Sequence, residues 1–493
     1  MKMKFCFIAA SLMSLLLCHF PASAAPAKGD ILKEAVRLER KGQFTDASSL
    51  LRNFLKENKG RLSAKENKAI LFQIVRMRRI RIDYSLTADQ LYGQLENGIS
   101  GVTRAEFRKW IREKKFDDRF LDDTLRFVNA SRSNLFFRYP DIAARRIPPV
   151  HEKQRYLGIL ANCLEIERTA DSLRTPYVLP KSFNMKMVVT VDSGTVKPGD
   201  LIKAWLPIPH KFPYQIDFKL VSSSTKPIDI ASPESPIRSV FMEQPANSDG
   251  GAKFSIEYTY ETFGVHFNLE ASHATQYDKS DNVYKKFTSE GPNIIFTSRI
   301  SSLSKKIIGK VNNPVVKAKL IYDWIAHNIE YSFAREYSTL NNISNYCLTH
   351  RYGDCGQEAM LFITLCRYNG IPARWQSGWF FIPGGKDIHD WTQIYIEPYG
   401  WVPVDPYMGI LSTQYMTSLT EAQRKIVRDF YFGGLDQYRM SANSNNNQKL
   451  SPAKRFFRSD NVDFQRAELE TDTHNIYFNH FDYSLNVKEE DGK

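Results

Sequence analysis

Hydrophobic and polar residues repeat with two different periods along this chain, and the change between them divides it into regions. From residue 28 to 175 the apolar positions recur at helical spacing. Over 180–275 they alternate with polar residues between Gly- and Pro-containing turns, which predicts an antiparallel β-sandwich. Over 290–430 a helical pattern precedes two alternating ones, and short β-like segments continue over 431–493. The predicted fold class is therefore α+β.

The first 24 residues have the pattern of a secretory signal peptide. Two lysines precede an apolar run over 5–20, and small residues follow up to Ala24. The run is shorter than a membrane span requires, and no later stretch reaches that length. Leu17 precedes Cys18 where a lipidation signal has a small residue, so we do not expect a lipid anchor. The prediction is an exported protein, periplasmic or extracellular, without a transmembrane segment.

Within the helical region, residues 85–130 predict two helices followed by a short β-hairpin. Thr103 is the expected N-cap of the second helix, with Glu106 completing a capping box. Two helices followed by a hairpin resemble a winged helix, which in the cytoplasm would favour DNA binding. After an export signal, a packing or interaction module is the better interpretation, and we expect no nucleic-acid partner.

Residues 352–372 predict a turn followed by a helix that begins with a cysteine. Gly353 and Asp354 form the turn, Cys355 follows, and apolar residues recur at helical spacing up to Tyr368. The free N–H groups and dipole of a first helical turn favour an anion. We therefore expect the pKa of the Cys355 thiol to be lowered, and the same N–H groups could bind an oxyanion.

Two alternating segments, 389–396 and 401–405, predict paired strands that carry a histidine and an aspartate. A four-residue turn would put His389 and Asp405 on opposite faces, whereas one more residue or a bulge would put them on the same face. On one face, His389 could accept the proton of Cys355 while Asp405 orients the imidazole ring. The predicted catalytic residues are Cys355, His389 and Asp405, and they require the second arrangement.

These segments together resemble the transglutaminase-like superfamily. The matching motifs, in order over roughly residues 312–410, are Gly353-Asp354-Cys355-Gly356, Gly370-Ile371-Pro372-Ala373-Arg374, His389-Asp390-Trp391 and Gly400-Trp401 to Asp405-Pro406. The resemblance implies a papain-like core with the cysteine on a helix and an antiparallel sheet beside it. It implies that Cys355 is the nucleophile, His389 the general base and acid, and Asp405 the orienting carboxylate. No acidic calcium loop is visible, so we expect neither a metal nor another cofactor.

Further side chains near the motifs are candidates for substrate contacts. The resemblance implies an oxyanion side chain upstream of Cys355, and Tyr331, Tyr337 and Tyr346 are all in range. Trp391 could stack on a substrate, although core packing is the simpler interpretation. None of the three tyrosines can be preferred from the sequence.

Composition and cysteine content narrow the class of protein. The 493 residues, 42% of them hydrophobic and 25% charged, predict several globular domains. The net charge falls from +13 to about +11 when the two leader lysines are removed, which favours anionic cell-surface partners. Cys163, Cys347, Cys355 and Cys366 then remain, too few for a disulfide scaffold, although a Cys163–Cys347 bridge stays open. Cys347 and His350 fit no zinc spacing.

The sequence thus predicts an exported cysteine-nucleophile enzyme that acts on amide bonds through a thioester on Cys355. Its substrate would be a peptide or protein, such as a cell-envelope peptide. Hydrolysis is favoured over transamidation because water is abundant outside the cytoplasm. The alternatives are a catalytically silent binding or scaffold protein of the cell envelope, and a surface module whose helical and β regions present a substrate. The oligomeric state stays open.

Overall fold

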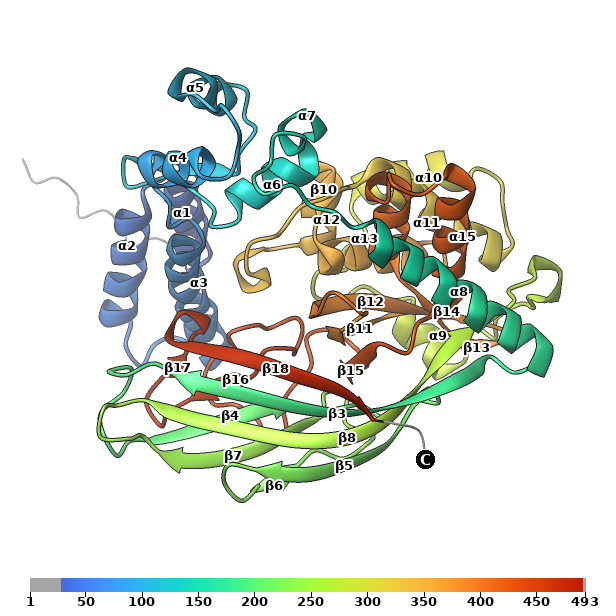
Figure 1. Cartoon of the computed structure of the whole chain (residues 1–493). Helices are drawn as coiled ribbons and strands as arrows, with labels where there is room; N and C mark the ends of the chain where they lie inside the picture. Colours follow the sequence, from blue (N-terminus) through green and yellow to red (C-terminus); the bar gives the residue numbers. More distant parts are fainter. Residues whose placement is uncertain (1–27, 491–493) are drawn as a thin grey trace, which may run out of the picture. The chain divides into compact units, whose positions relative to one another are not determined.

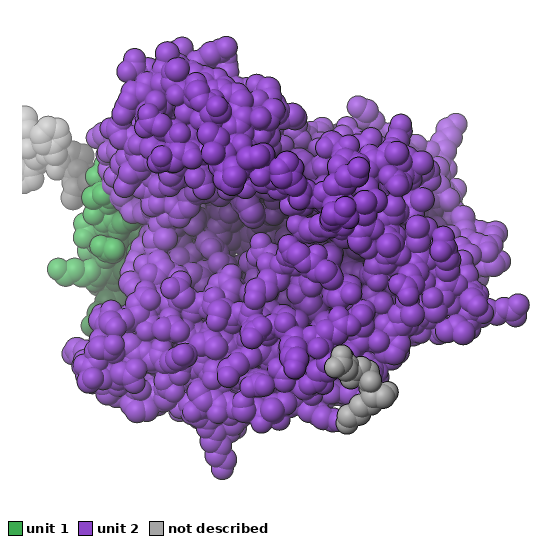
Figure 2. Space-filling view, in the orientation of Figure 1, with its two compact units in different colours: residues 1–74 green, residues 75–493 purple. Residues whose placement is uncertain are grey.

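The computed structural model describes residues 28–490, so the predicted signal peptide lies outside the described residues. The chain divides into two compact units, residues 1–74 and 75–493, coloured green and purple in Figure 2. Helices and antiparallel sheets alternate along the described residues (Figure 1), which confirms the predicted α+β class. No helix in this part of the chain combines the length and apolarity needed to cross a bilayer.

The first unit is helical over its described residues. Its elements are α1 (Lys28–Arg40), α2 (Phe44–Glu57) and the first part of α3 (Ala64–Asp83). In α2 the buried residues are Phe44, Ala47, Leu51 and Phe54, which recur every three or four positions. This spacing places them on one face, so an amphipathic helix forms here as the sequence pattern predicts.

The second unit begins with the rest of α3, which further helices and a hairpin follow. These elements are α4 (Ala88–Glu96), α5 (Arg104–Arg112), β1 (Asp118–Leu121), β2 (Thr124–Phe127), α6 (Ser131–Arg138), α7 (Pro140–Ala143) and α8 (Lys153–Leu173). Thr103 caps α5 by accepting a hydrogen bond from the Glu106 N–H at 3.2 Å. The predicted capping box is wrong, because the Glu106 carboxylate binds Arg145 at 2.6 and 3.0 Å instead. The winged-helix likeness stays a prediction.

Two antiparallel sheets share one hydrophobic core in the middle of the chain. The first has the order β14-β8-β3-β18 with β5 on β8, and the second the order β17-β16-β4-β7-β6. The strands from this region are β3 (Tyr177–Val191), β4 (Leu201–Pro207), β5 (Gln215–Ser223), β6 (Asp229–Ile230), β7 (Ser239–Pro245) and β8 (Ala252–His266). Alternate residues of β3 and β4, such as Met187 and Ala204, meet in the shared core. Period-two patterning therefore produces a sandwich.

The C-terminal segment completes both sheets of the sandwich rather than extending beyond it. Its strands are β14 (Gly434–Leu435), β15 (Arg439–Asn443), β16 (Glu468–Glu470), β17 (Asn475–Ile476) and β18 (Phe481–Glu490). In Figure 1 the red strand β18 lies along the green strand β3, and Leu485 is paired with Met187. Strand β16 pairs with β4, and β15 joins the sheet described next. The C-terminal segment therefore contributes strands to all three of these sheets, up to Glu490.

A helical layer and a four-stranded sheet follow the sandwich. The helices are α9 (Asn282–Phe287), α10 (Ser298–Ile308), α11 (Pro314–Asn328), α12 (Ile343–His350), α13 (Cys355–Tyr368), α14 (Pro406–Ile410) and α15 (Glu421–Phe430). The sheet has the order β13-β12-β11-β15, with β11 (Ala373–Phe380), β12 (Asp387–Ile396) and β13 (Gly400–Val404), and a small parallel pair joins β9 (Glu330–Tyr331) to β10 (Tyr352–Gly353). Asn313 caps α11 and Pro314 is its first residue, a position that suits the fixed backbone angle of proline. Cys355 is the first residue of α13 in this helical layer.

Candidate active site

Helix α13 begins at Cys355, and its start is determined by local chemistry. Asp354 has an extended backbone and its Oδ1 accepts a hydrogen bond from the Gln357 N–H at 3.0 Å, so it is the N-cap of α13. Residues 356–367 are buried, whereas Cys355 is partly exposed. The thiol therefore lies at a partly exposed end of a helix whose middle is buried.

The pairing of β12 with β13 decides which face His389 and Asp405 share. Ile396 pairs with Gly400 and Thr392 with Val404, so the connecting loop has three residues. The loop is one residue shorter than the four-residue turn, not one residue longer as the hypothesis required. Either change from four residues puts His389 and Asp405 on the same face of the sheet. Asp405 therefore follows the strand on the face of Trp391 and His389, because alternate residues share a face.

His389 and Asp405 form a buried pair. The Nε2 atom of His389 lies 2.8 Å from Asp405 Oδ2, and the two side chains are 2% and 0% exposed. The His389 ring also packs against the rings of Phe380, Trp391 and Tyr407, with centroid distances of 5.1 to 5.7 Å. The ring is thus held in place by stacking and by one hydrogen bond.

Arg439 of strand β15 is a second partner of Asp405 that the sequence analysis missed. Its Nη1 donates to Asp405 Oδ2 at 2.7 Å, and its Nη2 binds Asp436 Oδ2 at 2.9 Å. Burial alone would raise the pKa of Asp405, but the charges of His389 and Arg439 outweigh it and lower that pKa to about 2. Asp405 is therefore an anion at neutral pH despite being fully buried.

The Cys355 thiol is hydrogen-bonded to Asp390 of β12 and not to His389. Its Sγ lies 3.8 Å from Asp390 Oδ2, and the hydroxyl of Tyr337 donates to Asp354 Oδ1 at 2.8 Å and to Asp390 Oδ2 at 3.1 Å. Among the described residues no hydrogen bond joins Cys355 to His389. The structure therefore brings His389 and Asp405 together and places Cys355 beside Asp390, the next residue of the same strand.

The thiol environment opposes ionisation. Burial raises the pKa of Cys355 well above its ordinary value, and the carboxylates of Asp390 and Asp354 raise it further. The expectation of a lowered pKa was therefore wrong, because two acidic side chains surround a sulfur that the helix N-terminus alone would favour as an anion. In this arrangement Cys355 is a protonated thiol at neutral pH.

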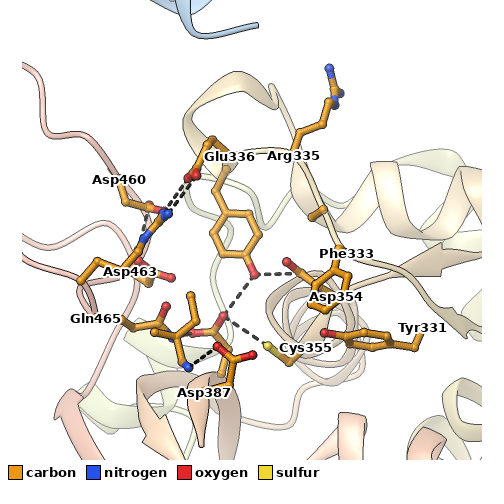
Figure 3. Close-up of a pocket in the computed structure, with 15 residues that line it drawn as sticks. Tyr331, Phe333, Arg335, Glu336, Asp354, Cys355, Asp387, Asp460, Asp463 and Gln465 are labelled. Atoms are coloured by element: carbon orange, nitrogen blue, oxygen red, sulfur yellow. Dashed lines mark hydrogen bonds and ion pairs between the residues drawn. The ribbon is translucent and has the colours of Figure 1, made fainter. Parts of the chain in front are cut away.

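The thiol opens into a cavity of about 170 Å³, shown in Figure 3. Its walls come from the segment before α12, from the start of β12 and from the C-terminal segment that includes Asp463 and Gln465. The Gln465 amide donates to the backbone oxygen of His389 at 2.9 Å and to Asp390 Oδ1 at 2.8 Å. The sequence analysis did not predict Asp463 or Gln465. Both are more than 100 residues from Cys355 in the chain, and nothing in the sequence around them indicates that they contact the site.

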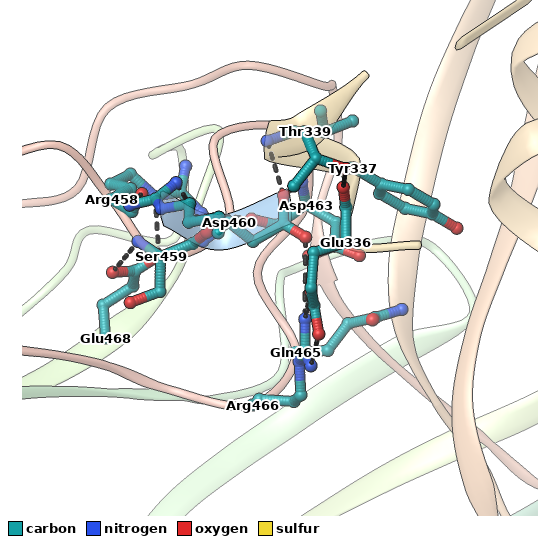
Figure 4. A network of polar contacts seen from close by, with 12 residues as sticks. Glu336, Tyr337, Thr339, Arg458, Ser459, Asp460, Asp463, Gln465, Arg466 and Glu468 are labelled. Carbon is teal, nitrogen blue, oxygen red and sulfur yellow. Dashed lines mark hydrogen bonds and ion pairs between the residues drawn. The ribbon is translucent and has the colours of Figure 1, made fainter. Parts of the chain in front are cut away.

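An ion-pair network holds the C-terminal segment against the segment before α12. Arg466 binds Glu336 with two hydrogen bonds, at 2.8 and 2.6 Å, and lies 3.7 Å from Asp460 Oδ2 (Figure 4). Such paired contacts between a planar guanidinium and a carboxylate fix orientation as well as distance. This network thus joins two segments of the cavity wall that are 130 residues apart in the sequence.

The remaining candidates are placed differently from one another. Tyr331 and Tyr337 line the cavity. Tyr346 does not line it; its ring packs on His350 at 4.2 Å. Trp391 is fully buried next to residues of the sandwich such as Tyr214, so its place is in packing rather than at the cavity.

The remaining residues that the sequence drew attention to are the cysteines and Arg374. The structure has four free thiols among its described residues: Cys163, Cys347, Cys355 and Cys366. The disulfide between Cys163 and Cys347 that the sequence left possible is therefore not formed. Arg374 donates a hydrogen bond to Gln393 Oε1 at 2.8 Å and lies 4.0 Å from the centre of the Trp401 ring, with no ion pair among the described residues. No cluster of three or more potential metal ligands occurs among the described residues.

Comparison with known proteins identifies the domain around Cys355. Residues 301–406 match the sequence model of the Transglutaminase-like superfamily, and this segment is a transglutaminase-like domain. An uncharacterized protein of Haemophilus influenzae is 25% identical over 232 residues, which are 41% of this chain and 60% of that protein. Uncharacterized protein YebA of Bacillus subtilis is 24% identical over 139 residues, or 24% of this chain and 19% of that protein.

Two solved structures are also similar in part. One is a candidate cysteine protease from Cytophaga hutchinsonii, with 18% identity, a TM-score of 0.41, and coverage of 64% of this chain and 93% of that one. The other is the periplasmic domain of TgpA from Pseudomonas aeruginosa, with 13% identity, a TM-score of 0.26, and coverage of 49% and 93%. The transglutaminase-like assignment therefore depends on the sequence match to residues 301–406.

Proposed function

We propose that this protein is an exported cysteine-nucleophile enzyme that cleaves amide bonds of peptides or proteins through a thioester on Cys355. The observation that carries the proposal is a partly exposed thiol at the start of α13, inside a cavity and beside strand β12, whose His389 is paired with Asp405. Its place in a transglutaminase-like domain supports the same chemistry.

The proposed reaction has two steps. In the first, His389 accepts the thiol proton, the Cys355 sulfur bonds to the amide carbonyl carbon, and the C–N bond breaks as His389 passes that proton to the leaving amine. In the second, water attacks the thioester, the C–S bond breaks, and the water proton passes through His389 to the sulfur. The products are a carboxylic acid, an amine and the free thiol, so atoms and charges balance.

Three groups of this chain have distinct roles in that sequence. Asp405 keeps the His389 ring oriented and stabilises its cationic form, because Asp405 stays ionised down to a pH of about 2. The first N–H groups of α13 have no partner within the helix and can bind the oxyanion that forms on the carbonyl. For proton transfer, the Cys355 side chain must leave Asp390 and reach His389 when substrate binds.

Hydrolysis is the proposed outcome rather than transamidation. An exported enzyme meets water at a far higher concentration than any single amine, and the proposed signal peptide over residues 1–24 places it outside the cytoplasm. An amine acceptor would attack the same thioester and release the same leaving group, so the two outcomes differ only in the second product.

The test compares cell-envelope peptides treated with the wild type and with Cys355→Ala, followed by mass spectrometry. We expect new termini with the wild type and a loss of turnover of about a millionfold in the variant. Cys366→Ala is the matched control, since it removes a buried thiol of the same helix. His389→Ala should act like Cys355→Ala, whereas His327→Ala, at an exposed site on α11, should not. Turnover by Cys355→Ala would exclude the thioester mechanism.

One observation favours the alternative of a catalytically silent binding protein. The pKa of the Cys355 thiol is raised, and its hydrogen-bonding side chain is Asp390 rather than His389. The two functions separate in the rate of alkylation by iodoacetamide. An enzyme shows reactivity that depends on both Cys355 and His389, whereas a silent protein shows slow alkylation that is the same in His389→Ala.

A further inference from the structure

The cavity beside Cys355 has an unbalanced set of charged side chains. Six carboxylate side chains line it, against two guanidinium groups. The carboxylates belong to Glu336, Asp354, Asp387, Asp390, Asp460 and Asp463. Such a concentration of one sign in a partly enclosed site produces a strong local potential.

Neither guanidinium balances the carboxylates nearest the thiol. Arg466 is occupied by Glu336, at 2.6 Å, and by Asp460, at 3.7 Å. Arg335 extends away from the centre of the cavity in Figure 3, and its guanidinium lies near the rings of Tyr84 and Tyr346, 5.7 and 5.3 Å from their centres.

Asp390 and Asp354 are bonded only to uncharged donors and to the thiol. Asp390 accepts from Tyr337 and Gln465, and Asp354 accepts from Tyr337 and the Gln357 N–H. Neither forms an ion pair within the described part of the chain. The side of the cavity next to the sulfur therefore holds two carboxyl groups without a matching cation, and burial raises the pKa of Asp390 well above its ordinary value and that of Asp354 to about 7.

Asp463 is the least satisfied group of the cavity. Its side chain lines the wall that the C-terminal segment provides, and the residue is only 3% exposed. Its carboxylate makes no hydrogen bond or ion pair with another described residue. Burial, together with the charges of Asp460 and Asp390, raises its pKa well above the ordinary value. A buried carboxylate without a partner is costly, so this position is suited to a cation from outside the chain.

We propose that Asp463 and Asp390 bind an ammonium or guanidinium group of the substrate, on the residue whose carbonyl Cys355 attacks or on its immediate neighbour. This inference rests on the proposed function and names its substrate class as amides flanked by a cationic side chain. Asp390 Oδ2 lies 3.8 Å from the Cys355 sulfur, so a cation held there lies within one residue of the reacting carbonyl.

The cation belongs to the acyl donor and not to an attacking amine. An amine attacks a thioester only in its neutral form, and nearby carboxylates stabilise the charged form and raise the pKa of the amine. The same carboxylates stabilise a cation that remains charged throughout the reaction. The acidic wall therefore assists a bound lysine-like or arginine-like side chain and hinders an amine nucleophile.

The test uses two peptidyl chloromethyl ketones that differ only in the residue next to the reactive group, lysine in one and norleucine in the other. Alkylation forms a C–S bond to Cys355, releases chloride and leaves the thiol proton in solution, so intact mass reports it. For the wild type we expect the lysine probe to react about tenfold to a hundredfold faster, the effect of one charge-assisted hydrogen bond.

Variants of Asp463 test whether this residue causes the faster reaction of the lysine probe. Asp463→Asn should reduce the ratio of the two rates to near one. Asp463→Lys should reverse the preference, so that the norleucine probe reacts faster than the lysine probe. Asp482→Asn, at an exposed carboxylate of β18, is the matched control and should keep the wild-type ratio.

Each outcome decides between the two proposals. Equal rates for both probes in the wild type overturn the cation inference and leave the nucleophile intact, whether or not the variants fold. A lysine preference that survives in a folded Asp463→Asn overturns the role of Asp463. If neither probe modifies Cys355 while iodoacetamide modifies the unfolded chain, the proposed function fails, and the substrate class fails with it.

Discussion

Arg439 Nη1 lies 2.7 Å from Asp405 Oδ2, the same oxygen that lies 2.8 Å from His389 Nε2. A fully buried carboxylate thus meets a guanidinium and an imidazole at one atom, with Asp436 on the other side of the guanidinium. The arginine keeps Asp405 ionised, and Asp405 in turn orients His389. Arg439 is therefore a positioning residue for the proposed proton transfer.

Replacing this arginine should affect both stability and the pH profile. Arg439→Met removes the guanidinium that the buried carboxylates of Asp405 and Asp436 share, and we expect a loss of about 3–5 kcal/mol in the free energy of unfolding, measured with urea. The pKa of Asp405 should rise, so the acidic limb of the kcat/KM profile should move to higher pH. Arg52→Met, at an exposed arginine, is the control. An unchanged acidic limb in a folded variant would exclude the positioning role.

The sign of the linked pH effect follows from the direction of the Asp405 shift. The folded-state pKa is lowered from 3.8 to about 2, so its stabilising contribution is complete above pH 4 and is lost as the pH falls toward 2. The wild type should lose stability in this window more steeply than Arg439→Met does.

Asp390 should control the ionisation of the thiol. Because its carboxylate is the largest charge that raises the pKa of Cys355, Asp390→Asn should shift the pH dependence of iodoacetamide alkylation to lower pH. Asp482→Asn should leave this dependence unchanged. An unaltered pH–rate curve for Asp390→Asn would mean that Asp390 carries no charge while the thiol ionises.

Gly356 should be required by the space beside Tyr337. A Cβ atom at this position would collide with the Tyr337 hydroxyl and the Asp390 carboxylate. We expect Gly356→Ala to displace Tyr337 and to lower kcat/KM at least about tenfold, by misplacing groups next to the nucleophile. Gly93→Ala is a helical control with nothing within 4 Å of the added atom, and it should stabilise the protein by about 0.5–1 kcal/mol. Full activity of Gly356→Ala would contradict the crowded geometry.

Glu358 should make the folded protein less stable as the pH rises. It is fully buried on α13, neither carboxylate oxygen has a partner among the described residues, and burial raises its pKa well above 4.5. In the folded state it keeps a proton that the unfolded chain loses above about pH 4.5, so the free energy of unfolding falls by about 1.4 kcal/mol per pH unit until the folded-state pKa is reached.

The variant Glu358→Met should remove this slope and raise stability at neutral pH. Urea denaturation at a series of pH values measures the difference between the two proteins. Glu270→Met, at an exposed position, should retain the wild-type slope. A wild type and a Glu358→Met variant with parallel pH dependence would show that Glu358 finds a partner in solution.

The sequence by itself determined the parts of the site that depend on neighbouring residues. The capping side chain of Asp354 and the helical spacing after Cys355 place the thiol at the start of α13, because capping and periodicity act within a few residues. The predicted turn at Gly353 is wrong, because Tyr352–Gly353 forms strand β10, which pairs with β9. The alternating segments predicted strands β12 and β13. The motifs along them predicted the transglutaminase-like domain that the match to residues 301–406 bears out.

Only the tertiary structure decided what surrounds the thiol. A one-residue difference in the β12–β13 loop sets which face Asp405 shares, and sequence reasoning could state this condition without resolving it. Arg439, Asp463 and Gln465 reach the site because β15 joins the core sheet and the C-terminal strands join the sandwich. Arg439 bonds to Asp405 across 34 residues of sequence and Gln465 bonds to His389 across 76, so these contacts depend on packing of the whole unit rather than on local pattern.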